Sequence, residues 1–325
     1  MRICVFGAGA IGGHLAARLA LRGAEVSVVA RGDNLRAMGE RGITLRAPDG
    51  TFAARPRAAA AAAELGSQDA VLVTVKAPAL PAAAEAIQPL LGPETPVVFV
   101  TNGIPWWYFD REGGPREGTR LPLVDPGDAI RTAIGTARTI GGVVWSACTV
   151  TEPGTVHVQT PQSRLVLGEL DGRVTPRLEA LAAAIGDTDA MRGEATPDIR
   201  TAVWTKLLNN LTNGPACLLT RQDMKTTFSD PVVLRSALTV MREGLALAAA
   251  LGRPIPGDSE SRILRSVGVA HKPSILQDSE AGRPLEFDAL LTQPLDLARE
   301  AGVPMPVLEL LVAMARQATG HRAPA

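Results

Sequence analysis

The sequence predicts an α/β domain with a mainly parallel sheet and an antiparallel extension, followed by an all-α domain. Three observations lead to this fold class. Short apolar runs alternate with helical patterns through the first half of the chain, and only helical patterns follow Pro197. The 325 residues, 46% of them hydrophobic, are also enough to bury two cores. We therefore expect one domain over residues 1–194 and a second over residues 195–325.

The predicted strands of the first domain are RICVF, EVSVVA, AVLVTVK and PVVFVTN. Because helical patterns separate them, such as the one over residues 11–22, they indicate parallel βαβ units buried on both faces. The Gly/Pro-rich segment 111–128 is typical of a surface hairpin or loop. Three later runs, TIGGVVWSACTV, GTVHVQT and RLVLGEL, have the spacing of an antiparallel extension. A helix over residues 174–186 and the short segment TDAMRG complete the domain.

The second domain has apolar residues recurring at helical spacing, which predicts helices over residues 198–213, 231–251, 258–267, 284–301 and 306–317. Composition excludes several classes of protein. The formal net charge of zero argues against a nucleic-acid or membrane-surface binder, and no apolar run is long enough to span a membrane.

Three distant cysteines without CxxC spacing, together with the lack of a secretory signal, predict a cytoplasmic protein without disulfides. The four histidines have no metal-ligand spacing, so we expect no metal site.

The segment GAGAIG at residues 7–12 has the pattern G-x-G-x-x-G between a predicted strand and a predicted helix. In a dinucleotide site of Rossmann type, Gly7 would permit a tight turn, Gly9 a close approach of the pyrophosphate, and Gly12 close helix–strand packing. A plain glycine-rich turn is the alternative. The expected cofactor-binding loop consists of Gly7, Ala8, Gly9, Ala10, Ile11 and Gly12.

The end of the second strand favours NADP(H) over NAD. An NAD site would have Asp or Glu there for the ribose hydroxyl, but this chain has Ala30 followed by Arg31, whose guanidinium suits a 2′-phosphate. Asp33 could instead hold a ribose, and Arg31 could be an ordinary surface charge.

Lys76 and Asn102 each end a predicted strand, so both are expected to face the cofactor, as ligands of open α/β sheets do. An exposed charge and an Asn-Gly turn are the alternative explanations. The aromatic run at residues 106–109 could wall a cleft, form a subunit contact, or be a hydrophobic cluster of its own.

The segment WTKLLNNLTNGP carries Lys206, one of only four lysines among 33 basic residues, with Asn210 one helical turn later. Reduction of a carbonyl needs a proton donor, which Lys206 can supply. Glu286 follows Pro284, so it is predicted in the first turn of a helix, where it could hold the ammonium or bind a substrate hydroxyl. A surface lysine, a capping acid and a helix–helix hydrogen bond are the alternatives for these three residues.

Taken in order, GAGAIG, TVKAPAL, TNGIPWW, WTKLLNNLTNGP and HKPSILQDSEAGRPLEFD resemble the ketopantoate reductases (2-dehydropantoate 2-reductases) over nearly the whole chain. The resemblance implies a Rossmann domain, a helical domain and an active site between them. It implies Lys206 as general acid, Asn210 and Ser274 as substrate ligands, and Glu286, which matches the glutamate of the family's E-x-D motif, as the second catalytic residue. Lys76 and Asn102 match the strand-end residues that contact cofactor and substrate, and Arg31 matches the phosphate-binding arginine.

Three positions depart from the family pattern. Gly214 stands where Asn usually precedes a proline, Leu291 stands where Asn is common, and Pro294 falls inside a predicted helix, where it costs about 3 kcal/mol unless the helix kinks. The sequence thus predicts an NADPH-dependent reductase of a small 2-oxo acid, with ketopantoate, in pantothenate synthesis, as the best candidate. A reductase of another 2-oxo acid and a non-enzymatic NADP(H)-binding regulator are the alternatives, and the resemblance makes a homodimer plausible.

Overall fold

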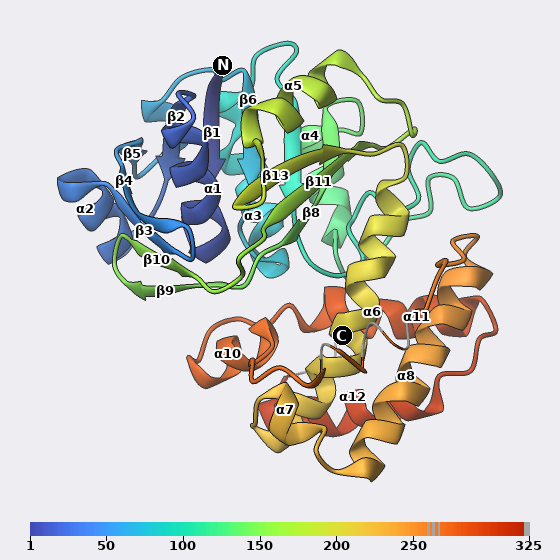
Figure 1. The fold of residues 1–325 in the computed structure, drawn as a ribbon. Coiled ribbons are helices and arrows are strands. Elements are labelled where there is room, and N and C mark those ends of the chain that lie inside the picture. Colours follow the sequence, from blue (N-terminus) through green and yellow to red (C-terminus); the bar gives the residue numbers. More distant parts are fainter. Residues whose placement is uncertain (259–260, 262–263, 266, 322–325) are drawn as a thin grey trace. The chain divides into compact units, whose positions relative to one another are not determined.

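The computed structural model describes residues 1–258, 261, 264–265 and 267–321 (Figure 1). The chain forms two compact units. The first consists of Met1–Thr101, Trp106–Arg120 and Asp125–Ile199; the second consists of Asn102–Pro105, Leu121–Val124 and Arg200–Ala325. The first unit is a mixed, mainly parallel α/β structure and the second is helical, which confirms the predicted fold class.

A nine-stranded sheet forms the centre of the first unit, in the order β12-β13-β11-β8-β7-β6-β1-β2-β5. All neighbours from β5 to β8 pair in parallel, and β11 pairs antiparallel with β8. The strands are β1 (Arg2–Phe6), β2 (Glu25–Val29), β5 (Arg57–Ala59), β6 (Ala70–Val73), β7 (Val97–Val100), β8 (Thr139–Trp145), β11 (Arg164–Glu169), β12 (Asp187–Thr188) and β13 (Met191–Ala195).

A second sheet of four strands has the order β4-β3-β10-β9. Its strands are β3 (Ile43–Ala47), β4 (Gly50–Ala54), β9 (Cys148–Glu152) and β10 (Thr155–Val158). The predicted single antiparallel extension was therefore wrong in one respect. The run TIGGVVWSACTV divides, with β8 in the large sheet and β9 paired with β10 in the small one.

Helix α1 (Ala10–Leu21) packs against β2 of the large sheet and against all four strands of the small sheet. A Cβ atom on Gly13 would lie 2.8 Å from Val156 Cγ2, so the glycine permits this close approach of β10. The other helices of the unit are α2 (Gly32–Arg41), α3 (Leu80–Ala86), α4 (Ala129–Ile134) and α5 (Pro176–Ile185), with 3-10 turns η1 (Ala62–Glu64), η2 (Ala77–Ala79), η3 (Gln88–Leu90) and η4 (Pro126–Asp128).

The strand order reverses beside β1. The chain proceeds from β1 through β2 to β5 in one direction, and then from β6 through β7 to β8 in the other. Right-handed crossovers in opposite directions place α1 and α3 on opposite faces of the sheet. The carboxyl ends of β1 and β6 consequently meet at the switch point, the place where ligands of open α/β sheets bind.

The aromatic run Trp106–Phe109 belongs to the interior of the first unit, because its four side chains are at most 1% exposed. The Trp106 ring makes an edge contact with Phe99 at 5.6 Å between centroids, and the Arg131 guanidinium lies over it at 5.4 Å. The sequence left three roles open for this run: a cleft wall, a subunit contact or a hydrophobic cluster. The structure fits the hydrophobic cluster, because little aromatic surface is left for a contact with another subunit.

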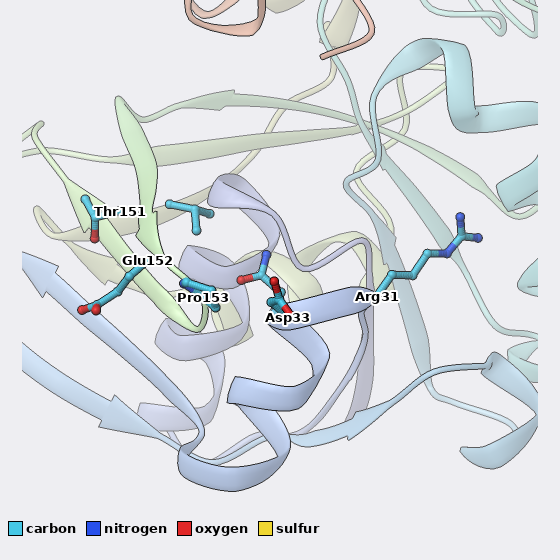
Figure 2. A pocket seen from close by; sticks show the side chains of 7 residues that line it. Arg31, Asp33, Thr151, Glu152 and Pro153 are labelled. Carbon is cyan, nitrogen blue, oxygen red and sulfur yellow. The ribbon is translucent and has the colours of Figure 1, made fainter. Parts of the chain in front are cut away.

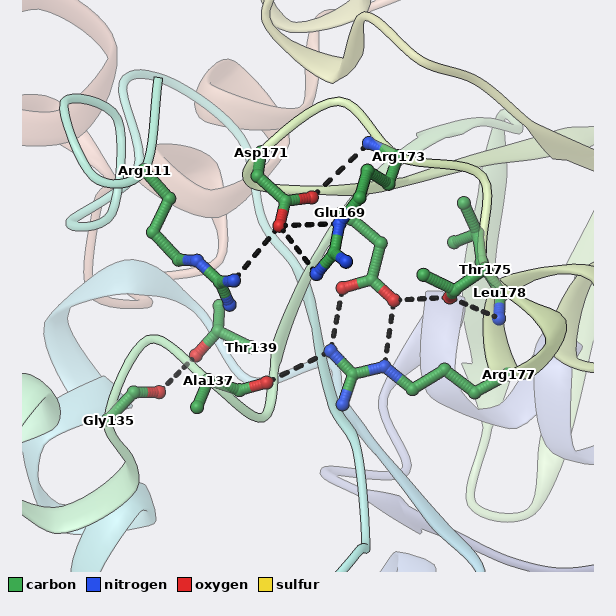
Figure 3. A network of polar contacts seen from close by, with 10 residues as sticks. All are labelled: Arg111, Gly135, Ala137, Thr139, Glu169, Asp171, Arg173, Thr175, Arg177 and Leu178. Atoms are coloured by element: carbon green, nitrogen blue, oxygen red, sulfur yellow. Dashed lines mark hydrogen bonds and ion pairs between the residues drawn. The ribbon is translucent and has the colours of Figure 1, made fainter. Parts of the chain in front are cut away.

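A network of ion pairs follows β11 (Figure 3). The Glu169 carboxylate, 3% exposed, accepts hydrogen bonds from Arg177 Nε and Nη2 at 2.7 and 2.6 Å and from Thr175 Oγ1 at 2.6 Å. Asp171 accepts from Arg111 and from Arg173. Burial alone would raise the pKa of Glu169, but the bonds from Arg177 and Thr175 outweigh it and hold the pKa below its ordinary value.

The second unit contains α6 (Ile199–Thr220), α7 (Met224–Thr227), α8 (Pro231–Ala250), α10 (Ser274–Glu280), a π-helical turn η5 (Asp288–Thr292), α11 (Gln293–Glu300) and α12 (Pro306–Thr319). Helix α6 continues through Pro215, beyond the predicted end at residue 213. The helix predicted over 258–267 lies partly outside the described residues. None of the helices in the described part of the chain is long and apolar enough to cross a membrane.

Close packing joins α6, α8 and α12. A Cβ atom on Gly244 of α8 would lie 2.7 Å from Leu208 Cδ2 of α6. Glu243, 8% exposed, accepts the backbone N–H groups of Val307 and Leu308, both at 2.9 Å, in the first turn of α12. A buried carboxylate at a helix N-terminus satisfies donors that the helix itself leaves without partners.

Candidate active site

The glycine-rich loop joins β1 to α1 with the geometry expected of a dinucleotide site. Gly7 has a φ of +104°, and a Cβ atom there would lie 2.6 Å from Val75 Cγ1. A Cβ atom on Gly12 would lie 2.2 Å from the Gly7 carbonyl oxygen, so only glycine permits this contact between helix and loop. The Cβ position of Gly9 meets nothing within 4 Å, which leaves the backbone open to a ligand.

Thr74, which follows β6, holds the loop from the other side of the switch point. Its hydroxyl donates to the Gly7 carbonyl oxygen at 2.7 Å. The first α-helical bond of α1 runs from Gly13 N–H to Gly9 O, so the N–H groups of Ala10, Ile11 and Gly12 precede the helical ladder. These groups and the helix dipole favour a pyrophosphate at this position. The role of Thr74 was missed, although it lies within the strand run AVLVTVK.

Arg31 and Asp33 lie at the start of α2 and line a pocket of about 400 Å³ together with the end of β9 and Pro153 after it (Figure 2). The exposed Arg31 side chain extends away from Asp33 and from Glu152 of β9. Asp33 forms an ion pair with Arg36 at 3.3 Å. Asp33 thus has a cationic neighbour on its own helix, and the exposed Arg31 side chain follows the carboxyl end of β2.

Lys76 is half-buried and precedes the 3-10 turn η2. It lies three residues beyond β6, which ends at Val73, so the expected strand-end position is displaced into the connection. Asn102 likewise follows the end of β7 by two residues and belongs to the second unit.

Within the second unit, Asn102 and Glu286 come together. Asn102 Nδ2 donates to Glu286 Oε2 at 3.0 Å, across 184 residues of sequence, and Glu286 is only 7% exposed. Glu286 lies immediately before a helix, not in its first turn as predicted, since its carbonyl accepts the Leu290 N–H at 3.0 Å. The sequence indicated both residues separately, and the structure brings them together.

Pro294 leaves one carbonyl of the π turn after Glu286 without a helical donor. The Gln293 N–H donates to the Asp288 carbonyl, five residues back. In the same register the next donor for the Ala289 carbonyl would be residue 294, but proline has no N–H. The Ala289 carbonyl instead accepts the Ile104 N–H at 2.9 Å. This bond fixes the segment Asn102–Pro105 beside Glu286.

Gly103 is required for that attachment. Its φ is +83°, and a Cβ atom would lie 2.2 Å from the Ala289 carbonyl oxygen and 2.4 Å from its carbon. Both values are far below any normal contact, so a side chain here would separate the segment from the π turn.

The remaining candidates of the second unit lie on α6 and α10. Lys206 and Asn210 are half-buried and one turn apart on α6. Ser274 is the exposed first residue of α10. A Cβ atom on Gly214 would lie 3.5 Å from Ile275 Cγ2, so this family departure leaves ordinary space beside α10. Leu291 is 1% exposed and belongs to the core of the unit.

The second unit supplies a buried carboxylate–amide pair, a lysine and further amides, and the first unit supplies a dinucleotide-type loop. A lysine can transfer a proton, and amides and hydroxyls can orient a polar substrate. Among the residues that the structure describes, no group of three or more His, Cys, Asp or Glu side chains could hold a metal ion.

Comparison with known proteins identifies the family. The model of the ketopantoate reductase PanE/ApbA family matches residues 3–172, and that of its C-terminal region matches residues 198–319. A 2-dehydropantoate 2-reductase from Mesorhizobium japonicum is 42% identical over 326 residues, covering 99% of both chains.

Two solved structures agree. A protein from Ralstonia solanacearum, assigned as a ketopantoate reductase, is 41% identical with a TM-score of 0.90, covering 99% of this chain and 98% of its own. The 2-dehydropantoate 2-reductase from Geobacter metallireducens is 30% identical with a TM-score of 0.83, covering 98% of this chain and all of its own. The resemblance seen in the sequence is thus confirmed, and the chain belongs to the ketopantoate reductase (2-dehydropantoate 2-reductase) family of oxidoreductases.

Proposed function

We propose that the protein catalyses the NADPH-dependent reduction of 2-dehydropantoate to (R)-pantoate, a step of pantothenate synthesis. The buried Asn102–Glu286 pair is the observation that carries the proposal. A carboxylate that is only 7% exposed needs hydrogen bonds to stay buried, and the Asn102 amide supplies one from a distant segment, in the unit that also carries Lys206. The relatives described above that are named 2-dehydropantoate 2-reductases support this substrate.

NADP(H) fits the loop Gly7–Gly12, because the open Cβ position of Gly9 and the amino-terminal N–H groups of α1 can receive a pyrophosphate. Arg31 would bind the 2′-phosphate through a charge-assisted hydrogen bond, because its guanidinium follows the carboxyl end of β2. Lys76 and Asn102 would complete the cofactor contacts. The cofactor supplies the hydride when bound.

Lys206 would donate the proton that the keto oxygen needs as it becomes a hydroxyl. Asn210 and Ser274 would orient the substrate through hydrogen bonds. Glu286, fixed by Asn102 at 3.0 Å, would hold the Lys206 ammonium or bind the substrate hydroxyl. These roles follow from residue chemistry and family resemblance.

A reductase of another branched 2-oxo acid is the second candidate. Gly214 favours it, because this position has no side chain and lies next to Ile275, the neighbour of Ser274. A family member with asparagine at this place would present an amide there. Loss of the amide favours a less polar substituent on the substrate.

The test measures NADPH oxidation with a panel of 2-oxo acids, including 2-dehydropantoate and aromatic and unbranched compounds. We expect Lys206→Ala to lower kcat by about 10²- to 10⁴-fold, the usual contribution of a general acid. The matched control is Lys225→Ala, which removes an exposed lysine of α7 in the same unit and should leave kcat unchanged.

Turnover that persists in Lys206→Ala would refute the proposed proton donor. A kcat/KM for another 2-oxo acid well above that for 2-dehydropantoate would transfer the proposal to the second candidate. A cytoplasmic homodimer stays a prediction from the sequence.

A further inference from the structure

The carboxyl end of α12 folds over the residue that follows Glu286. Phe287 is fully buried, and the His321 ring stacks on it with 4.5 Å between centroids and 20° between planes. The Arg316 guanidinium lies 5.5 Å from the centroid of the same ring. Two side chains from the end of the chain thus hold one aromatic ring in place.

Polar contacts link the same residues into a connected group. Asp288 Oδ1 lies 3.4 Å from His321 Nε2 and accepts the Thr292 hydroxyl at 3.0 Å. Arg316 Nη2 donates to Thr292 Oγ1 at 3.1 Å. The His321 N–H donates to the Arg316 carbonyl at 3.1 Å, which turns the chain end back onto η5. We call Phe287, Asp288, Thr292, Arg316 and His321 the C-terminal clamp.

The clamp acts on the residues adjacent to Glu286. Glu286 is joined to Phe287 by a planar peptide bond, so a rotation of the fixed Phe287 backbone would redirect the Glu286 carboxylate. The Asn102 amide restrains the Glu286 side chain directly, at 3.0 Å. The clamp adds a restraint through the backbone, by way of Phe287 and the first π-helical residue, Asp288.

We propose that Arg316 and His321 are positioning residues for Glu286, so that the end of α12 sets the geometry of the substrate site without touching substrate. The inference rests on the proposed function, because it needs Glu286 to act on the 2-oxo acid. Arg316 and His321 lie outside every sequence motif that indicated the family.

The test compares variants that remove one contact at a time. His321→Ala removes both the stacking and the contact with Asp288, and we expect it to raise KM for the 2-oxo acid about tenfold, a typical coupling between neighbouring groups. KM for NADPH should not change. His321→Phe keeps the stacking and should recover most of the loss. Gln317→Ala, an exposed neighbour on α12, is the matched control and should behave as wild type.

A double-mutant cycle separates positioning from general stabilisation. If His321 acts through Glu286, His321→Ala should add less than about threefold to KM in a Glu286→Gln background, instead of tenfold. Equal effects in both backgrounds, or a parallel rise in KM for NADPH, would overturn the inference. Should His321→Ala fail to fold, Arg316→Ala gives the same cycle with Glu286→Gln, because it removes the guanidinium beside Phe287 and the bond to Thr292 while the stacked His321 ring stays.

The two proposals fail in different ways. If Glu286→Gln turns over the 2-oxo acid as wild type does, the role of Glu286 in the proposed function is wrong. If Glu286→Gln is impaired while His321→Ala and Arg316→Ala keep the wild-type KM, only the clamp is wrong.

Discussion

Gly103→Ala tests whether the attachment of the segment Asn102–Pro105 to the π turn builds the substrate side of the site. Alanine at a φ of +83° costs about 1–2 kcal/mol by itself. The added Cβ would also lie 2.2 Å from the Ala289 carbonyl oxygen, which belongs to rigid backbone, so the segment must move away. That movement breaks the Ile104 bond to Ala289, worth about 1 kcal/mol, and the Asn102 bond to Glu286, worth about 1.5–3 kcal/mol.

We therefore expect Gly103→Ala to lower the free energy of unfolding by about 3.5–6 kcal/mol, and to raise KM for the 2-oxo acid in the fraction of the protein that folds. Gly302→Ala is the matched control in the same unit. Its φ is +67° but its Cβ position meets nothing within 4 Å, so only the backbone strain of about 1–2 kcal/mol should appear.

Urea unfolding followed by circular dichroism measures the stability difference, and NADPH oxidation at varied 2-oxo acid concentrations measures KM. Equal destabilisation by the two substitutions would refute the reasoning, because the contact with Ala289 would then contribute nothing. Strong destabilisation with an unchanged KM would show that the segment supports the fold alone.

Two further substitutions test the first unit. Arg31→Ala should raise KM for NADPH by about 10- to 100-fold and leave KM for NADH nearly unchanged, because it removes a charge-assisted bond to the 2′-phosphate. Arg36→Ala is the control. An equal rise in KM for NADPH and NADH would contradict the assignment of Arg31. Glu169→Gln should lower the free energy of unfolding by about 2 kcal/mol near pH 7, less than for a fully buried pair since the Arg177 side chain is 33% exposed. The folded pKa of Glu169 is below its ordinary value, so its contribution is present above about pH 4.3 and is lost as the pH falls through the folded pKa. In urea unfolding from pH 3 to 7, the free energy of unfolding should thus fall less steeply with acid in Glu169→Gln than in wild type. Glu194→Gln, at a more exposed ion pair, is the control. If the pH dependence of Glu169→Gln equals that of wild type or of Glu194→Gln, the reasoning is wrong.

Strongly patterned elements could be predicted from the sequence. The four parallel strands β1, β2, β6 and β7 are nearly continuous apolar runs, and the helices α8 and α12 have apolar residues at helical spacing. In the candidate site, Lys206 was indicated because carbonyl reduction needs a proton donor, and Lys76 and Asn102 because they follow predicted strands, whereas Ser274 came only from the resemblance to the family.

Short strands whose partners lie elsewhere in the chain could not be predicted. Strand β5 begins the alanine-rich segment 57–65, which has helical propensity, yet it pairs in parallel with β2. The division of TIGGVVWSACTV between two sheets occurs at residues 146–147, where the Ser146 hydroxyl meets the ring of His14 at 3.1 Å. Burial lowers the pKa of His14 to about 4, so this ring stays neutral and bonds as a neutral partner at ordinary pH.

Pro294 shows that the usual cost of a proline inside a helix depends on the surrounding structure. From sequence, a proline inside a helix is a cost, because one carbonyl of the preceding turn loses its donor. That cost assumes the helix is the only source of donors. Here the Ala289 carbonyl receives the N–H of Ile104 at 2.9 Å, and the π turn provides the space. The donor comes from a segment that carries Asn102, whose amide bonds Glu286. The Ala289 carbonyl, which has no helical donor between the π turn and Pro294, is therefore the attachment point for the segment that carries Asn102, and the proline is compatible with the scaffold of the candidate site.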